Sequence, residues 1–262
     1  GVRLADVNGD GLVDIIKGER NSDGTCGDSE KTSWINNRNG WTQNDSWEPP
    51  RCFVENDGDS NGLILADVNG DGLVDILYGK TSSGGICGSS QKEAWINNRN
   101  GWTQNDSWEP PECFILYQGQ DEGFRLIDIN SDGLTDILYG EEDSAENCDN
   151  SEKTSWINNG NGWTQNDSWD PPECFVGYYG EDRGSILGDI NSDGLVDIIS
   201  AEGGNRHAWL NNGTQWIGAD NPWDPPIRIV KSTGEDEGVR LADVNGDGLH
   251  DIIKSKSEDD KD

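Results

Sequence analysis

The chain has 262 residues, of which 51 are acidic and 19 are basic, so its formal net charge is −32. This charge excludes a nucleic-acid backbone as the partner, because phosphates are bound by Lys and Arg. No apolar run approaches the ~20 residues of a membrane-spanning helix, so no membrane insertion is expected. The hydrophobic content of 31% is typical of disorder, but the 12 Trp and an internal repeat argue against it.

The first 16 residues are the first copy of a repeat. They return with small changes at Gly62, Gly123, Gly184 and Gly238, in steps of 61, 61, 61 and 54 residues. A Trp-rich segment follows each of the first four copies, and these segments contain all 12 Trp. The pattern predicts repeats at 1–61, 62–122, 123–183 and 184–237, then a half-repeat with an acidic tail at 238–262, all in one domain.

The local signals within a repeat are those of β-strands. In the first copy, an apolar run at 2–7 and the segment 14–17 flank a Gly-rich acidic loop, which predicts a hairpin. Residues 32–36 are the third predicted strand, and Trp41 begins the fourth. Four strands in about 60 residues predict an all-β, β-propeller-type array with four complete four-stranded blades and a fifth half-blade. A β-solenoid is the rival, although its rungs are usually shorter.

Every copy also carries the pattern Asp-x-Asn-x-Asp-Gly-Leu-x-Asp. Side-chain oxygens at positions 1, 3, 5 and 9, with a backbone carbonyl at position 7, can surround a hard cation such as Ca²⁺. The predicted ligands are Asp6, Asn8, Asp10, Leu12, Asp14, Asp67, Asn69, Asp71, Leu73, Asp75, Asp128, Asn130, Asp132, Leu134, Asp136, Asp189, Asn191, Asp193, Leu195, Asp197, Asp243, Asn245, Asp247, Leu249 and Asp251. About five Ca²⁺ ions are therefore expected as part of the fold. Metal-free Asx turns are the alternative interpretation.

The strand, the acidic loop and the Ile-Ile/Leu-x-Gly that follows resemble the FG-GAP/VCBS repeats of integrin-α-like β-propellers. The segments Trp-Ile-Asn-Asn-x-Asn-Gly-Trp are also similar to hairpins of VCBS repeats in large secreted or surface proteins. The resemblance implies a propeller whose loops bind calcium at one face, in a family that includes adhesion proteins, lectins and toxin scaffolds. The Cys-containing insert and the Trp-x-Pro-Pro segment depart from the minimal repeat.

The six cysteines form three pairs with the same spacing. Cys26 and Cys52, Cys87 and Cys113, and Cys148 and Cys174 are each 26 residues apart, and the shorter fourth repeat lacks both members. Because the fourth repeat has lost both cysteines together, we predict a disulfide within each of the first three repeats. Free buried thiols are the alternative. Such disulfides are typical of an oxidising compartment, so an extracellular, secreted or cell-surface location is expected. No signal-peptide pattern is present, which predicts a mature or trimmed segment.

Four Asn-x-Ser/Thr sequons support this location. They begin at Asn44, Asn105, Asn166 and Asn212, and the first three occupy the same place in their repeats. We expect N-glycosylation there if the source is eukaryotic.

The Trp residues separate into two groups. Trp34, Trp95, Trp156 and Trp209 lie in predicted strands, where packing between blades explains them. Trp47, Trp108, Trp169 and Trp223 precede Pro-containing segments in predicted loops. A loop Trp could stack on a sugar ring, or it could close the blade edge against the prolines.

No catalytic arrangement emerges, because His207 and His250 occupy isolated, non-repeated positions. The expected function is therefore non-enzymatic: a structural or adhesive calcium-binding protein. A calcium-dependent lectin and a scaffold module of a larger surface or toxin-like protein are the alternatives. The expected partners are other copies or neighbouring modules, and glycans or cell-surface proteins.

The fifth motif predicts assembly. Residues 238–253 match 1–16 at 15 of 16 positions, yet no Trp hairpin follows to cover the apolar runs at 239–244 and 252–253. An uncovered strand edge can pair with another chain, and a head-to-tail contact of that kind builds a fibre or array. A monomeric ring closed by an incomplete fifth blade is the alternative.

Overall fold

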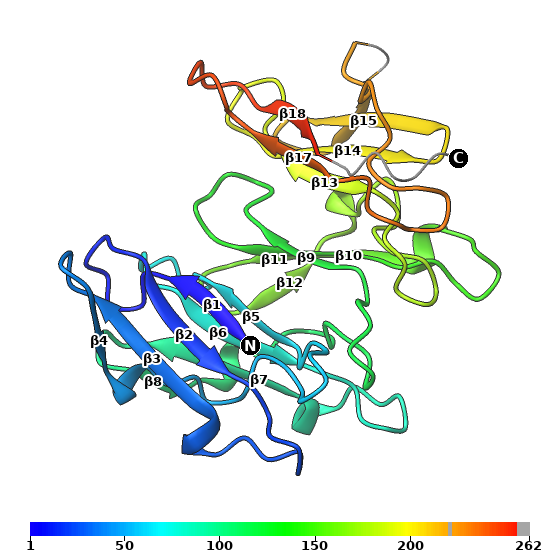
Figure 1. The fold of residues 1–262 in the computed structure, drawn as a ribbon. Helices are drawn as coiled ribbons and strands as arrows, with labels where there is room; N and C mark the ends of the chain where they lie inside the picture. The colour runs from blue at the N-terminus through cyan, green and yellow to red at the C-terminus, as the bar shows by residue number, and fades with distance from the viewer. Residues whose placement is uncertain (220–221, 256–262) are drawn as a thin grey trace. The chain divides into compact units, whose positions relative to one another are not determined.

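A computed structural model describes residues 1–219 and 222–255, so most of the predicted acidic tail lies outside the described residues. Strands dominate the fold, in four four-stranded sheets and one two-stranded sheet (Figure 1). Six short 3₁₀ helices accompany them, and no α-helix occurs between residues 1 and 219 or 222 and 255. The prediction of an all-β array with four complete blades and a half-blade is confirmed.

The strands follow the repeats closely. The first two sheets contain β1 Val2–Ala5, β2 Asp14–Gly18, β3 Lys31–Asn36, β4 Trp41–Gln43, β5 Leu63–Ala66, β6 Asp75–Gly79, β7 Lys92–Asn97 and β8 Trp102–Gln104. The others contain β9 Phe124–Ile127, β10 Asp136–Gly140, β11 Lys153–Asn158, β12 Trp163–Gln165, β13 Ser185–Gly188, β14 Asp197–Glu202, β15 Asn205–Asn211, β16 Trp216–Ala219, β17 Val239–Ala242 and β18 Asp251–Lys254. Each sheet is an antiparallel meander in which consecutive strands are neighbours.

The 3₁₀ helices lie at two places in the first three repeats. One precedes the third strand, at η1 Asp28–Glu30, η3 Ser89–Gln91 and η5 Asn150–Glu152. The other follows the fourth strand, at η2 Asp45–Trp47, η4 Asp106–Trp108 and η6 Asp167–Trp169. The second group matters for packing, because each of these helices ends on one of the loop tryptophans.

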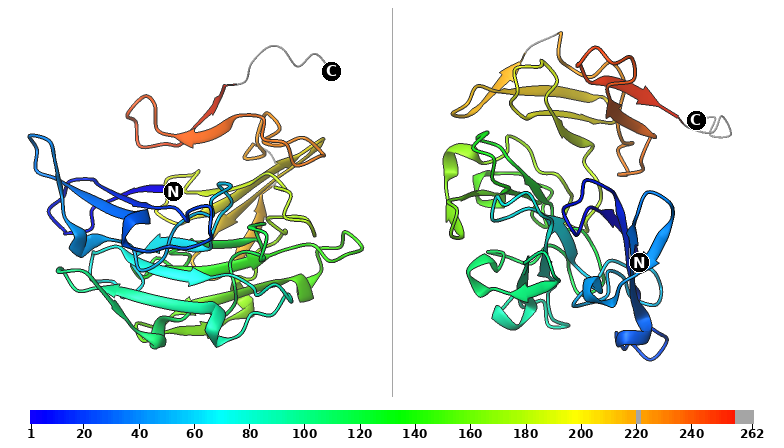
Figure 2. Two further views of the ribbon diagram at one scale, coloured as in Figure 1. Left: turned by 60° about the horizontal axis from the view of Figure 1, so that its bottom comes forward. Right: turned by 90° about the vertical axis from the view of Figure 1, so that its left-hand side faces the viewer.

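The chain forms two compact units, which we describe separately. One contains residues 1–122 and 157–164, and the other contains 123–156 and 165–262. In the first unit, Val7 and Ile16 of the first repeat pack with Leu63, Ile76 and Trp95 of the second. The two further views in Figure 2 show these strands in blue and cyan. The apolar core thus lies between consecutive sheets, as expected for blades.

The core of the second unit corrects one prediction about the half-blade. Val239 is fully buried against blade four, and Leu241 and Ile252 pack on the same cluster. The apolar strands at 239–244 and 252–253 are therefore mostly covered, because the preceding blade packs on β17 and β18. Among the apolar side chains of these runs, only Val244 and Ile253 are exposed.

The three predicted disulfides are confirmed. Cys26 is bonded to Cys52, Cys87 to Cys113 and Cys148 to Cys174. Each joins the segment between the second and third strands to the chain leaving the blade, and the second cysteine of each pair is buried. No helix in the described part of the chain is long and apolar enough to cross a membrane.

Candidate functional site

In the acidic loops, backbone N–H groups donate hydrogen bonds to side chains of the same loop. In the first loop, Asp6 accepts hydrogen bonds from the backbone N–H groups of Gly9 at 2.8 Å and Gly11 at 2.7 Å. Asn8 Oδ1 accepts from Asp10 N at 2.9 Å. The first Asp of the second and fifth loops accepts the same pair of bonds. The polar positions at the start of the motif therefore set the loop backbone, as Asx turns do.

The last Asp of the motif is buried and ties the loop to the sheet. Asp75 accepts from Val68 N at 3.1 Å and from Asn97 N, in the third strand of the blade, at 2.7 Å. Asp14 and Asp197 accept the equivalent pairs of bonds. Desolvation by burial raises the pKa of Asp75 to about 6, and the nearby Asp71 and Asp67 add to the effect. Each of the first four loops thus holds a buried carboxylate in a strongly acidic surrounding.

An asparagine at the end of the third strand connects consecutive blades. Asn97 Nδ2 donates to the Val7 carbonyl of the preceding repeat at 2.7 Å, and Asn158 donates to Val68 in the same way. In the second unit, Asn211 Nδ2 donates to the Ile129 carbonyl at 2.7 Å. The acidic loops therefore belong to the contact between blades. Sequence reasoning missed this role, although Asn recurs at the position in every repeat.

The donor chemistry of the loops fits a hard cation, because every predicted ligand is an oxygen. A carboxylate oxygen that accepts one N–H still has a lone pair for a metal. Within residues 1–219 and 222–255, however, no three Asp, Glu, His or Cys side chains converge closely enough to hold a metal ion. The predicted set also includes amide and carbonyl oxygens, such as those of Asn69 and Leu73. The calcium sites therefore stay predictions.

The loop tryptophans are packing residues in three of four cases. Trp47, Trp108 and Trp169 are buried, and each meets a Trp of the next repeat edge-on, with ring centroids 5.5 to 5.9 Å apart. Their partners are Trp102, Trp163 and Trp216. Burial supports closure of the blade edge over sugar stacking for these three. Trp223 is 38% exposed.

The first three sequons occupy equivalent structural positions. Asn44, Asn105 and Asn166 are the N-caps of η2, η4 and η6, where the side-chain oxygen accepts from the Ser backbone two residues on. Asn212 lies in the turn after β15 and is exposed. No buried location prevents modification at these four places, and N-glycosylation stays a prediction.

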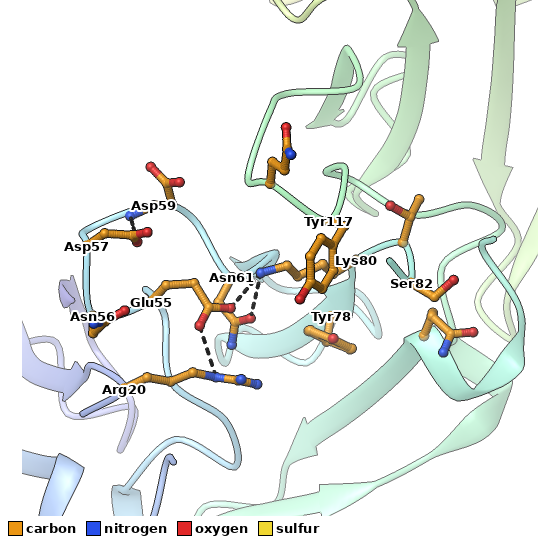
Figure 3. A pocket seen from close by; sticks show the side chains of 13 residues that line it. Arg20, Glu55, Asn56, Asp57, Asp59, Asn61, Tyr78, Lys80, Ser82 and Tyr117 are labelled. Carbon is orange, nitrogen blue, oxygen red and sulfur yellow. Dashed lines mark hydrogen bonds and ion pairs between the residues drawn. The ribbon is translucent and has the colours of Figure 1, made fainter. Parts of the chain in front are cut away.

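A polar pocket lies where the first repeat passes into the second (Figure 3). It has a volume of about 420 Å³, and its lining includes Arg20, Glu55, Asn61, Tyr78, Lys80 and Tyr117. Glu55 accepts from Lys80 Nζ at 2.6 Å, and Arg20 Nε lies 3.4 Å from the same carboxylate. Sequence reasoning missed this pocket, because its ion-paired residues Arg20, Glu55 and Lys80 are not repeated. That very departure from the repeat is the signal that could have found it.

Comparison with known proteins supports the fold. Residues 189–253 match the model of the FG-GAP-like repeat, from the start of the fourth acidic loop to β18. A solved structure of an Agrocybe aegerita lectin, described for its specific recognition of non-reducing terminal N-acetylglucosamine, is similar with a TM-score of 0.64 at 19% identity. That alignment covers 97% of this chain and 59% of the lectin chain.

A Photorhabdus luminescens Tc holotoxin pore aligns with a TM-score of 0.45 at 16% identity, covering 96% of this chain and 13% of that chain. This chain therefore spans less than two thirds of either structure. No curated protein matches it. The matched segment contains the acidic loop, the hairpin and the blade contacts that recur along the chain, and we conclude that this protein carries an FG-GAP-like repeat in a β-propeller-type fold.

Proposed function

We propose that this chain is an extracellular, non-enzymatic repeat module with a structural or adhesive role, stabilised by about five Ca²⁺ ions. The observation that carries the proposal is the recurrent loop, in which nine residues supply three carboxylates on one hydrogen-bonded frame. Bound Ca²⁺ would neutralise the mutual repulsion of these carboxylates. In the second loop, Asp67, Asn69, Asp71 and Asp75 would hold the ion, together with the Leu73 carbonyl.

The extracellular location rests on the three disulfides, which persist in oxidising compartments. The exposed sequon at the N-cap of η2 is compatible with it. A net charge of −32 would also keep a secreted module soluble and dispersed.

Calcium removal tests this proposal. A ligand at 100 times its Kd stabilises the native state by about 2.7 kcal/mol per site, so EGTA should lower the melting temperature sharply. Asp71→Asn should lose one equivalent of calcium by elemental analysis. Asp57→Asn, which removes a carboxylate from an exposed hairpin outside the loops, is the matched control. An unchanged melting temperature with no metal found would refute the calcium assignment.

Glycan binding is the second function we propose, and calcium dependence would follow from the stability of the scaffold. It is supported by the fold shared with the Agrocybe aegerita lectin and by the polar, aromatic-lined pocket of the first unit. A glycan array probed with and without EGTA tests it.

Assembly with further copies or modules remains the proposal for partners. The outer edge of β18 has no third strand beside it in the described structure, whereas β2, β6, β10 and β14 each have one. Ile253, on this strand, is exposed. Light scattering of the wild type and of Ile253→Lys in calcium tests the idea, and a monomeric wild type would refute it.

A further inference from the structure

The pocket of the first unit has the size of a small-molecule site. Its volume of about 420 Å³ lies within the range of ligand pockets, roughly 300 to 1,000 Å³. Two hairpins close it, at residues 55–59 and 116–120, each held by paired backbone hydrogen bonds. Gly119 has a φ of +82°, and a Cβ there would lie 3.0 Å from Asp59 Cβ. This glycine therefore lets the second hairpin lie against the first and places Tyr117 at the pocket.

The charges of the pocket favour a ligand without negative charge. Lys80 is buried, and its Nζ donates to Glu55 at 2.6 Å and to Asn61 Oδ1 at 3.3 Å (Figure 3). Arg20 and Lys80 share the single charge of Glu55, so these three side chains together keep one net positive charge, which the other acidic residues of the lining outweigh. Asp57 and Asp59 add two further carboxylates to the lining. A phosphate, sulfate or carboxylate ligand would be repelled.

The remaining groups suit a hydroxyl-rich ring. Tyr117 is 55% exposed, and its ring lies 5.8 Å from Lys80 Nζ. Tyr78 is buried, and it too lines the pocket. Thr81 is also buried, and its Oγ1 has no hydrogen-bond partner in the structure. A buried hydroxyl without a partner costs free energy that a ligand hydroxyl could recover.

We propose that this pocket binds one neutral saccharide residue, with a ring face on Tyr117. Thr81 Oγ1 is enclosed in the structure, so rotation about χ1 must turn it into the pocket before it bonds to a sugar hydroxyl. The inference rests on the second function proposed above and assigns it a site. Tyrosine suits such a contact, because its ring is apolar while its edge carries a hydroxyl.

The site is specific to the first junction between repeats. One repeat later, the positions of Glu55, Asn61 and Lys80 are occupied by Leu116, Glu122 and Glu141. The buried cation and the two side chains that accept hydrogen bonds from it are thus lost together. We therefore expect one saccharide per chain at this site rather than one per repeat.

The experiment uses the full chain in calcium on an array of neutral and sialylated glycans, followed by calorimetry with the best neutral monosaccharide. Tyr117→Ala should weaken binding about tenfold, and Thr81→Val about three- to tenfold. Tyr178→Ala is the matched control, because Tyr178 is the exposed tyrosine at the equivalent hairpin position of the next repeat. It should leave the affinity unchanged.

The outcomes separate the site from the function. A stoichiometry near one, with loss in both pocket variants, supports the inference. Glycan binding that survives both substitutions would keep the lectin function and overturn this site. Binding of sialylated glycans alone would contradict the charge argument, and a silent array would overturn both the site and the glycan-binding function. The calcium assignment is tested separately by metal content.

Discussion

The second and fourth repeats differ in how they connect the second strand of the blade to the third. In the second repeat, β6 and β7 are separated by residues 80–91, which carry Cys87 of the disulfide to Cys113. In the fourth, only Gly203 and Gly204 separate β14 from β15, and the strand pairing continues to Glu202 and Asn205. A covalent link secures the long arm, whereas the short hairpin is held without one, by strand pairing and by side-chain contacts such as Arg183 with Glu202.

The loss of the disulfide changes what lies at the blade exit. Arg228 occupies the position of the second cysteine in the fourth repeat and lies 3.7 Å from Glu237. The next two residues, Ile229 and Val230, still fill the core as Phe114 and Ile115 do in the second repeat. The comparison teaches that the disulfide serves the long arm, because the core is built without it when the arm is short.

Removal of a disulfide should have the largest effect. We expect Cys87→Ala/Cys113→Ala to lower the free energy of unfolding by about 3.5 kcal/mol, since a loop of this length is then released in the unfolded chain. Urea denaturation measures the change. The double variant should also become open to proteolysis within 80–91, while the hairpin at 203–204 stays resistant. Equal cleavage at both places would break the comparison.

The hydrogen bond between blades should contribute about the same free energy in both repeats, although only one of them has the disulfide. Asn97→Ala and Asn211→Ala each remove a buried amide that donates to a carbonyl of the preceding repeat, so each should cost about 1–3 kcal/mol. The two losses should agree within about 0.5 kcal/mol despite the disulfide in one repeat and its absence from the other. Asn98→Ala, at an exposed neighbour of Asn97, is the control and should cost far less. Unequal losses in thermal unfolding would show that the disulfide arm supports the blade contact.

Periodicity accounts for most of what the sequence could predict. Strands, blade number and disulfide pairs recur with the repeat, so each is indicated several times by independent copies. The sequence predicts Asp75 as a calcium ligand, but not as a buried acceptor for Asn97 N, because that bond joins residues 22 apart. The pocket depends on charged residues present once, Lys80 and Glu55, for which repetition offers no signal. For Trp47, the sequence is compatible both with stacking on a sugar and with packing against the prolines. The contact that decides between them comes from Trp102 in the next repeat.

The smallest expected effect concerns the residue that directly precedes the first Gly of each repeat, which we call the entrance to the repeat. At the entrance to the fourth repeat, Arg183 pairs with Glu202 at 2.7 Å, at the end of the lengthened β14. At the entrance to the third, Glu122 stands in its place, and desolvation by burial, with the charges of Glu112 and Asp121, raises its pKa from 4.5 to about 7. The entrances therefore differ in their response to pH.

Because folded Glu122 holds its proton more tightly than the unfolded chain does, its contribution to stability is full below pH 4.5 and is lost as the pH rises through about 7. Glu122→Gln should abolish this loss and melt at a slightly higher temperature than the wild type at pH 8, with little difference at pH 4. Glu112→Gln should give part of the same gain, because it removes a repelling charge and lowers the pKa of Glu122. Melting curves from pH 4 to 8 in saturating calcium keep the acidic loops filled during the comparison. If Glu122→Gln and the wild type lose stability in parallel over this range, another group causes the loss, and the third entrance is no more sensitive to pH than the fourth.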